Sequence, residues 1–478
     1  MVYRYLQAGS RQCHSQEVYV CYSCFLTVPK PDSSPQTANL QLQSLLFPAC
    51  IFLLMKIGIQ TWGSNGDVRP LLALASGLKQ AGHEISLIVS SIENRSYQSE
   101  CRMLGIQYRQ VPEHMDFDLE DFARRSARMS FLQWLKVFLD EAFFACEDQI
   151  YAAARQLAEE NDLLIGHHLL YPLKLAAKQA GKPFFSVTLC HAAIPDPAQA
   201  PLGLPNLGNI LNPLSWRLLE TAFNWALKKP LSRLWRQAGF TAPNRMLSEH
   251  LASQTLNLVA VDPVFCPSRQ GWPAQHQVCG FLDFTGDAEL WRLPASLAEF
   301  LENGPPPVYL TFGSVQQTAP EWSMDLFLEA VALTGCRAVV QTSSSRFPAG
   351  ARQGQVYFIG SHPHQPVFKR CAAVVHHGGA GTTHAATRSG CPSVVIPFMD
   401  EQLFWARRLQ SLQLAGKPLP SGKASAAALA RGLRTLLDND KFRLNARHIG
   451  DRMQNQTYGV GRAVQLIDRY FFRSITGQ

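Results

Sequence analysis

The sequence predicts an α/β protein built from two doubly wound, Rossmann-like domains that face each other across a cleft. Short apolar strands alternate with glycine-rich turns and helical stretches from residue 55 onward, which is typical of a parallel sheet with crossover helices. This winding stops in an aperiodic segment rich in Pro and Gly, and then restarts. The chain has 478 residues, which is too long for one ordinary hydrophobic core.

The first domain is expected over residues 55–283. Its opening unit is the strand "KIGIQT", the turn "GSNGDVRP", the helix "LLALASGLKQAG" and the strand "HEISLIVS". The segments "NDLLIGHH", "LKLAAKQAG" and "KPFFSVTL" repeat the strand–helix–strand order. Residues 115–160 and 205–255 are predicted to be mainly helical and are rich in aromatic residues, so we expect them to wall a pocket.

The second domain is expected over residues 305–478, after a linker at 284–304. Its strands are "PPVYLTFGSV", "RAVVQTS", "VYFIGS", "AAVVHH" and "PSVVIPF", with helices such as "DLFLEAVALTG" between them. The final helices, from about 424 to 474, close this domain, and the last of them is expected to pack back on the first domain.

Residues 1–54 differ from the rest and are expected to be an extension outside the fold. The apolar run "LLFPACIFLLM" contains Pro48 and is too short for a bilayer core of roughly 30 Å. A strand follows it directly, which does not fit a secretory signal peptide.

Composition narrows the class of function. Hydrophobic residues make up 46% and charged residues 17%, as in globular proteins. The net charge of +8 fits an anionic small ligand, an acidic membrane surface or nucleic acid. No arginine/lysine block, zinc finger or RNA-binding motif supports nucleic acid. The 12 cysteines are scattered and mostly in apolar contexts, so we expect reduced thiols and a cytoplasmic protein.

The run "AAVVHHGGAGTTHAATRSG" predicts an anion site between a strand and a helix. Gly378, Gly379 and Gly381 allow the backbone to approach a ligand, and the helix N-terminus offers unpaired N–H groups and a partial positive charge. The hydroxyls of Thr382 and Thr383 and the ring of His377 add hydrogen-bond donors. The predicted phosphate-binding residues are therefore Gly379, Gly381, Thr382, Thr383 and His377. A nicotinamide dinucleotide is the competing ligand, since Asp400 follows at a suitable distance, but the strand is late in its domain and the histidine pair is foreign to that fingerprint.

Asp67, in the turn "GSNGDVRP", is the candidate general base. A carboxylate at the end of the first strand faces the same cleft as the phosphate loop. The alternative is an N-cap just before a helix with Pro70 in its first turn, and local sequence favours neither.

Further polar residues follow other strands of the second domain. Ser314 ends a strand and is predicted to contact phosphate, while Glu401 and Gln402 are predicted to bind sugar hydroxyls. His364 precedes the phosphate-loop strand. No metal site is predicted, because the acidic pairs at 116/118 and 438/440 lie away from the loop.

Four motifs in order give the chain a family likeness: "GSNGDVRPLLALA", "PPPVYLTFGSV", "PHQPVFKRCAAVVHHGGAGTT" and "GCPSVVIPFMDEQLFWARRL". From Met55 to about residue 470 the chain resembles the nucleotide-sugar-dependent glycosyltransferases of the GT-B fold. The likeness is strongest to the branch of sterol glucosyltransferases, glycopeptide glycosyltransferases and rhamnosyltransferases.

The resemblance implies an inverting, metal-independent transfer of a hexose from a nucleotide diphosphate sugar, such as UDP-glucose, to a hydroxyl of a hydrophobic acceptor. The first domain would bind the acceptor, with Asp67 as base, and the second would bind the donor. His377 and the turn Gly379–Thr383 would hold the diphosphate, helped by Ser314. His364 would lie near the nucleoside, and Glu401 and Gln402 near the sugar.

Weaker expectations complete the site. Ser64 and Gly66 are expected to assist donor binding, and His168 and His191 to line the acceptor pocket. No cofactor is expected beyond the donor co-substrate. The basic tryptophan-containing stretch "NWALKKPLSRLWRQ" predicts either a surface helix or peripheral contact with the inner face of a membrane.

Two departures from the family pattern and two alternatives stay open. Glu401 stands where relatives commonly have Asp, which leaves the sugar undefined, and Asn65 stands where Arg is frequent. A nucleotide-sugar epimerase shares the fold, and a binding protein without turnover would keep the donor loop. The sequence leaves the acceptor and the nucleotide base undefined.

Overall fold

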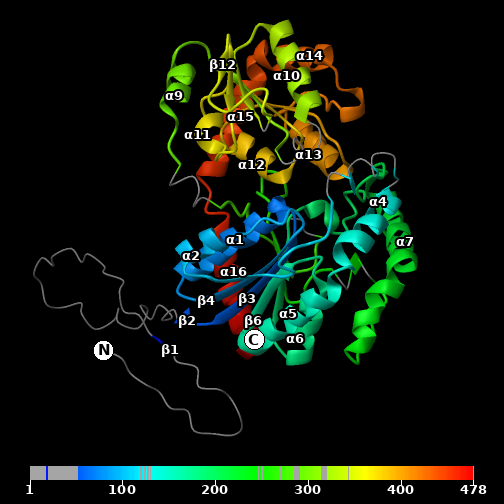
Figure 1. Ribbon diagram of the computed structural model, residues 1–478. Coiled ribbons are helices and arrows are strands. Elements are labelled where there is room, and N and C mark those ends of the chain that lie inside the picture. The colour runs from blue at the N-terminus through cyan, green and yellow to red at the C-terminus, as the bar shows by residue number, and fades with distance from the viewer. Residues whose placement is uncertain are drawn as a thin grey trace, which may run out of the picture.

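The computed structural model describes residues 18–19 and 52–476, except 119–120, 123–124, 126–128, 130, 246, 249–250, 268–270, 285–290, 314–319 and 343. The chain forms two halves, one above the other in Figure 1, and each half is organised around one sheet. Most of the extension at 1–54 lies outside the described residues. Within it, β1 (Val18–Tyr19) pairs antiparallel with β2 (Phe52–Leu53).

The first half contains a 7-stranded sheet in the order β5-β4-β3-β6-β7-β8-β9, and every pairing in it is parallel. Its strands are β3 (Lys56–Gly63), β4 (Glu84–Ser91), β5 (Gln107–Gln110), β6 (Leu163–His167), β7 (Phe184–Thr188), β8 (Leu256–Val259) and β9 (His276–Val278). Its helices are α1 (Asn65–Gln80), α2 (Gln98–Leu104), α4 (Phe131–Phe138), α5 (Glu147–Glu160), α6 (Tyr171–Ala180) and α7 (Gly208–Gln237). The chain changes direction across this sheet between β3 and β6.

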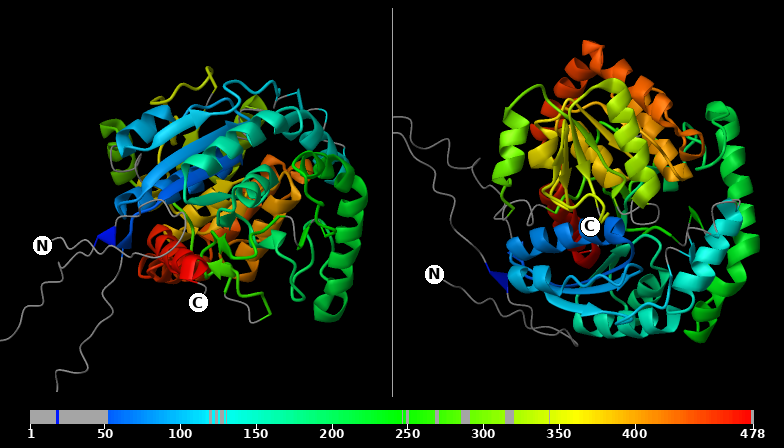
Figure 2. Two further views of the ribbon diagram at one scale, coloured as in Figure 1. Left: turned by 90° about the horizontal axis from the view of Figure 1, so that it is seen from below. Right: turned by 45° about the horizontal axis from the view of Figure 1, so that its top comes forward.

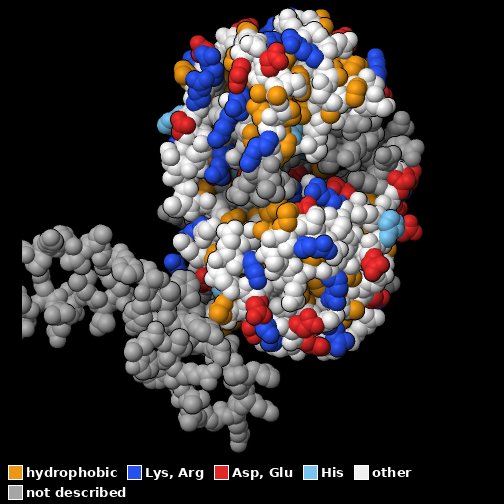
Figure 3. Space-filling view, turned by 60° about the vertical axis from the view of Figure 1, so that its left-hand side comes forward, with side chains coloured by type: hydrophobic (Ala, Val, Ile, Leu, Met, Phe, Trp, Pro, Cys, Tyr) orange, Lys and Arg blue, Asp and Glu red, His pale blue; other side chains and the backbone are white. Residues whose placement is uncertain are grey.

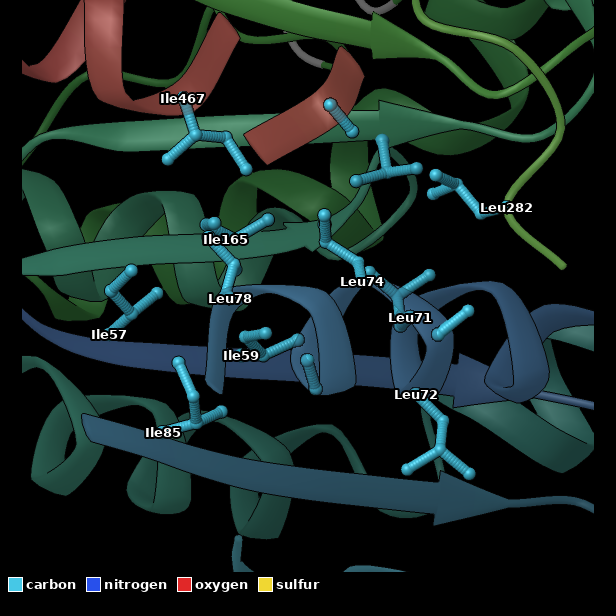
Figure 4. Packing of buried hydrophobic residues seen from close by; sticks show 14 of the residues in the cluster. Ile57, Ile59, Leu71, Leu72, Leu74, Leu78, Ile85, Ile165, Leu282 and Ile467 are labelled. Carbon is cyan, nitrogen blue, oxygen red and sulfur yellow. The ribbon is translucent and has the colours of Figure 1, made fainter. Parts of the chain in front are cut away.

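The core of this half explains why the first strand and helix form where they do. After Lys56, every residue of β3 is buried, so the strand sits inside the sheet with helices on both faces. Leu71, Leu74 and Leu78 recur at helical spacing on α1, and Figure 4 shows them packed over β3 and β6. Ile467, from the far end of the chain, closes the same cluster.

The second half contains a 6-stranded sheet in the order β12-β13-β11-β10-β14-β15. Only β12 pairs antiparallel within it, and the chain changes direction between β10 and β14. The strands are β10 (Val308–Leu310), β11 (Ala338–Gln341), β12 (Arg352–Gln353), β13 (Val356–Ile359), β14 (Ala373–His376) and β15 (Ser393–Val395). The helices are α9 (Ala295–Glu302), α10 (Pro320–Thr334), α11 (Gln365–Phe368), α12 (Ala380–Arg388), α13 (Asp400–Ser411), α14 (Ala426–Leu437) and α15 (Asp440–Gln454).

The last helix, α16 (Val460–Thr476), runs from the second half into the first, as the red ribbon in Figure 1 shows. It packs on α1 at Gly77, where an added Cβ would overlap the side chain of Val460. Gly77 therefore allows the two helices to approach closely.

Apolar contacts also join the two halves elsewhere. Cys190 and Val261, beyond strands of the first sheet, share one buried cluster with Trp405 and Leu409 of α13. This cluster fixes α13, and so the residues at its N-terminus, against the first half.

The structure differs from the sequence prediction in the segment 284–304, where a linker was expected. Residues Ala295–Glu302 form α9, and Leu297, Phe300 and Leu301 are buried against the second sheet. These apolar residues follow one another at intervals of three and one residues, a helical spacing that the surrounding Pro and Gly residues mask in the sequence.

The long helix α7 and the shorter α4 lie at the outer edge of the molecule in both views of Figure 2. Among the helices formed by the described residues, none has the length and apolar character that crossing a bilayer requires. On another face, basic side chains gather over the upper half, whereas acidic and basic side chains mix over the lower half (Figure 3).

Candidate active site

Asp67 lies in the first turn of α1, directly after the carboxyl end of β3. Its Oδ2 atom accepts hydrogen bonds from the backbone N–H and the hydroxyl of Ser64, both at 2.8 Å. Ser64 is the N-cap residue, so Asp67 is the third helical residue and not the N-cap that the sequence left open. The carboxylate therefore stabilises the helix start through Oδ2.

The second carboxylate oxygen of Asp67 points toward His167. The distance from Asp67 Oδ1 to His167 Nε2 is 3.9 Å, and the His167 side chain is 5% exposed. His167 ends β6, the neighbour of β3 at the point where the first sheet changes direction. In doubly wound sheets, ligands bind at the carboxyl ends of strands at this position.

The electrostatic setting of Asp67 suits a base. Burial raises its pKa, and the two hydrogen bonds from Ser64 oppose that rise. Burial also lowers the pKa of His167 to about 4, so this imidazole is neutral at neutral pH. A neutral imidazole does not neutralise the adjacent carboxylate.

His167 was not predicted as a site residue. The sequence reading selected the second histidine of "LIGHH", His168, for the acceptor pocket. His168 lies in the loop after β6, and its ring centroid is 4.5 Å from that of His167. The sequence does show that a strand ends at the histidine pair. It does not show that this strand lies next to the first one, because strand order cannot be read from local sequence.

The glycine-rich loop connects β14 to α12, at the change of direction in the second sheet. Gly378 has φ +94°, and Gly379 is the N-cap of α12. A Cβ on Gly379 would lie 2.4 Å from His377 Nε2, and one on Gly313 would lie 3.1 Å from His377 Cε1. The absence of a side chain at Gly379 and Gly313 therefore leaves space for the His377 ring. Glycine also allows the backbone to come close to a ligand.

Several buried polar atoms in this loop have no protein partner among the described residues. They are His377 Nδ1, Thr383 Oγ1 and His376 Nε2. Burial lowers the pKa of His377 to about 4, so the ring is neutral and carries one N–H donor. Buried polar atoms are normally paired, so this cluster fits a polar ligand at the start of α12.

The other predicted loop residues differ in their exposure. Thr382 and Thr383 are buried in the first turn of α12, while Gly381 is exposed. The helix N-terminus at Gly379 presents its free N–H groups at this end. Ser314 lies outside the described residues.

Glu401 and Gln402 occupy the first turn of α13, after β15. Glu401 Oε1 accepts a hydrogen bond from Trp405 Nε1 at 3.3 Å. Gln402 is buried, and its side-chain Oε1 accepts a hydrogen bond from the backbone N–H of Phe398 at 2.8 Å. The backbone carbonyl oxygen of Gln402 is the closest atom to a Cβ built on Gly378. Both residues therefore lie next to the glycine-rich loop.

Charges from the two halves meet at this position. Burial raises the pKa of Glu401, and the negative charge of Asp67 raises it further. Burial, and after it the neighbouring His362, Arg69 and His377, which disfavour a further positive charge, lower the pKa of His364, before α11, to about 3. Asp67 and Arg69 on the first half thus lie within electrostatic range of Glu401 and His364 on the second.

His384 on α12 links the halves directly. Its Nε2 accepts the backbone N–H of Asp262, from the first half, at 3.2 Å, and its Nδ1 lies 2.7 Å from the Ala380 carbonyl oxygen. These partners fix the neutral tautomer with the proton on Nδ1. Phe281 stacks on the ring at 4.2 Å, and a pocket between the halves is lined by Asp262, Phe281, Asp283, Gln365, His384, Ala385, Arg388, Met453 and Tyr458.

The remaining predicted residues lie around this centre. Ser64 caps α1, and Gly66 is exposed beside it. His191, in the short helical turn His191–Ala193 after β7, is 1% exposed and packs edge-on against Phe404 and Trp405 of α13. It therefore lies within the apolar contact between the halves.

Within the described residues, no group of three or more His, Cys, Asp or Glu side chains is arranged to hold a metal ion. Aromatic residues of the helical insertion pack around the buried side chain of Trp62. Trp62, at the end of β3, contacts the rings of Phe138 and Phe143, whose centroids are 5.4 and 5.1 Å away.

Comparison with known proteins shows which proteins the chain resembles. Residues 334–463 match the model of the erythromycin biosynthesis protein CIII-like C-terminal domain. Over 430 residues the chain is 28% identical to the O-mycaminosyltylonolide 6-deoxyallosyltransferase of Streptomyces fradiae, covering 87% of this chain and 97% of that enzyme. The chain thus has natural-product and sterol glycosyltransferases as homologues, and its structural neighbours are GT-B glycosyltransferases.

Other glycosyltransferases are similar to the chain in sequence or in fold. The chain is 26% identical to the sterol 3-beta-glucosyltransferase of Kluyveromyces lactis over 86% of its own length, but it spans only 34% of that enzyme. The solved calicheamicin glycosyltransferase CalG4 has a TM-score of 0.66 and 20% identity, with 88% of this chain and 99% of that one covered. The glycosyltransferase SsfS6 of Streptomyces sp. SF2575, solved with thymidine diphosphate, has a TM-score of 0.60 and 20% identity over 87% of this chain and 99% of that one. These likenesses confirm the predicted fold class.

Proposed function

We propose that this glycosyltransferase moves a hexose from a nucleoside diphosphate sugar, UDP-glucose or a close relative, to a hydroxyl of a hydrophobic acceptor, with inversion at the anomeric carbon. One observation carries the proposal. Asp67 of the first half and Glu401 of the second lie within range of each other's charge, and Gln402, next to Glu401, lies against Gly378 of the glycine-rich loop. A base, a sugar-binding carboxylate and an anion site thus converge at one point.

In the proposed reaction, Asp67 Oδ1 takes the proton of the acceptor hydroxyl. The hydroxyl oxygen forms a bond to the anomeric carbon as the bond from that carbon to the diphosphate oxygen breaks on the opposite face. The electron pair of the broken bond leaves with the diphosphate. The raised pKa of Asp67 makes its carboxylate a stronger proton acceptor than an ordinary aspartate.

The charge that develops on the leaving diphosphate is met by preformed donors. We assign this role to the neutral His377 N–H, the N–H groups at the start of α12 and the Thr382 and Thr383 hydroxyls, and not to a metal ion. Glu401 and Gln402 would bind the sugar hydroxyls. Their side chains already bond Trp405 and Phe398, which holds them in place before the donor arrives.

The acceptor class is proposed from two sources. The helical insertion of the first half is rich in aromatic residues, among them the partly buried Phe117 and Phe138, which favours an apolar molecule over a sugar or peptide. The relatives are named for action on sterols and on O-mycaminosyltylonolide. A sterol-like, lipid or natural-product aglycone fits both.

The direct experiment incubates the enzyme with UDP-glucose and dTDP-glucose, each with and without a panel of sterol, lipid and polyketide acceptors. We expect glucosylated product only with an acceptor, and loss of turnover by at least about a hundredfold in Asp67→Asn, because general base catalysis contributes this much or more. Asp67→Asn should still bind the nucleoside diphosphate.

The same experiment separates the alternatives. An epimerised sugar formed without acceptor would establish the epimerase. Donor binding with no product from any acceptor would favour a binding protein, and full turnover by Asp67→Asn would contradict its role as base.

A further inference from the structure

Helix α7 has apolar residues on two opposite faces. On the inner face, Trp216, Leu231, Leu234 and Trp235 are buried against the first half. On the outer face, five large side chains are exposed, and we name them the outer stripe: Ile210 (89% exposed), Leu211 (48%), Leu214 (52%), Leu218 (62%) and Trp225 (88%). A monomer gains nothing from displaying these residues together, so a contiguous stripe marks a contact surface.

The spacing places the outer stripe on one side of the helix. Leu211, Leu214, Leu218 and Trp225 follow one another at intervals of three, four and seven residues. From residue 210 to 225 the stripe extends about 22 Å at the helical rise per residue. Because α7 lies at the edge of the molecule in Figures 1 and 2, a flat surface can reach this side of it.

The charges on α7 are almost all positive. It carries Arg217, Lys228, Lys229, Arg233 and Arg236, but only one acidic residue, Glu220. The Glu220 carboxylate accepts the backbone N–H groups of Leu247 and Ser248, at 2.8 and 3.3 Å, so it is turned inward. Arg217 and Lys228 are exposed and follow Leu214 and Trp225 by three residues each, which places them along the border of the stripe.

We infer that the outer stripe of α7 docks the enzyme on a bilayer surface that carries anionic headgroups. Leucines and a tryptophan on one side, bordered by Lys and Arg, are the features of a helix that lies in the membrane interface. Trp favours the boundary between headgroups and acyl chains. The basic border favours a membrane over a second copy of the chain as the binding partner. In a two-fold dimer through the outer stripe, the Lys and Arg residues of the two copies would lie close together and repel each other.

This surface is separate from the transfer reaction proposed above and does not depend on it. Asp67 and the His377 loop contain no residue of the stripe, so membrane binding and turnover on a dissolved acceptor can be measured independently.

The test is flotation of the full-length protein with vesicles of phosphatidylcholine alone or mixed with phosphatidylglycerol. We expect binding to the mixed vesicles, weakened by salt. The double variant Leu214→Gln/Leu218→Gln should bind at least about tenfold less, because it withdraws two leucines from the apolar contact. Its matched control is Leu333→Gln/Leu444→Gln, at positions of similar exposure (46% and 61%) on α10 and α15, which should bind as the unchanged protein does.

Further variants keep the test decisive. Trp225→Gln should also weaken binding, and Arg217→Gln/Arg236→Gln should remove the preference for phosphatidylglycerol. All variants keep residues 1–54, so that segment cannot explain a difference among them, and matching circular dichroism melting curves establish that they fold. The inference is overturned if the unchanged protein does not float, if the stripe and control variants float equally, or if sedimentation equilibrium shows a dimer that the stripe variants abolish.

Discussion

At the scale of single residues, Asp67 combines two tasks that the sequence presented as alternatives. Its Oδ2 completes the helix cap with Ser64, while Oδ1 is directed toward His167. One carboxylate has enough acceptor sites for both tasks. The cap also fixes the rotamer of the side chain, which is what a positioned base requires.

The hydrogen bonds from Ser64 predict a shift in the pH–rate profile. The base works only as a carboxylate, so the rate falls as pH drops through the Asp67 pKa. Because Ser64 lowers that pKa and burial raises it, Ser64→Ala should move the acid limb of kcat/KM to higher pH. The measurement is kcat/KM against pH, with Ser76→Ala on the same helix as the control; an unmoved limb contradicts the assignment of that limb to Asp67.

Residue chemistry in the sequence predicts roles for Asp67, His377 and Glu401, but it could not place His167 next to Asp67. The residue types in each motif indicate what a position can do. Whether two positions meet depends on strand order, and β6 lies next to β3 although about a hundred residues separate them. The same holds for His384, whose partner Asp262 belongs to the other half.

At the scale of elements, the loop between β14 and α12 was well predicted. The apolar strand, the positive-φ glycine and the helix start all leave marks in the local sequence. The helix α9 was missed, since its burial is decided by the distant β10 and β14 strands against which it packs. The start of α1 at Asn65, after the N-cap Ser64, was also missed, because the sequence analysis considered only Asp67 as a cap.

The loop predicts a specific effect on donor binding. His377→Ala should weaken binding of UDP or dTDP by roughly tenfold or more, because a hydrogen bond to a charged group is worth about 1.5–3 kcal/mol. The change also opens space beside Gly379 and Gly313, so the backbone need not move. Calorimetry on this variant gives the affinity, and Asp67→Asn serves as the matched control with affinity unchanged; equal affinities for both would refute the loop as the diphosphate site.

At the scale of the whole molecule, buried neutral histidines predict an acid-sensitive fold. His167, His377 and His384 have pKa values lowered to about 4, and His364 and His376 to about 3, with burial the largest cause each time. Unfolding would return them to the ordinary value of about 6.5. In the unfolded chain these histidines therefore bind more protons over this range.

It follows that the free energy of unfolding should be constant above about pH 7 and fall between about pH 6.5 and 4. Each such histidine contributes a slope of about 1.4 kcal/mol per pH unit. Urea unfolding at pH 7.5, 6 and 5 measures the slope, and His376→Asn should reduce it if the variant folds. A stability that stays constant down to pH 5 contradicts the burial of neutral histidines.

The two halves form one working unit because contacts tie them together at several places. α16 packs on α1, α13 shares a buried cluster with the first half, and His384 bonds Asp262. These contacts hold Asp67 within range of the charge of Glu401. The proposed chemistry depends on this placement more than on any single residue.

The anomeric configuration of the product tests this placement most directly. With an α-configured donor such as UDP-glucose and an accepted hydrophobic alcohol, proton NMR of the product should show a β-glucoside whose formation Asp67→Asn abolishes. An α-glucoside, or a β-glucoside formed equally well by Asp67→Asn, would contradict direct displacement with Asp67 as the base.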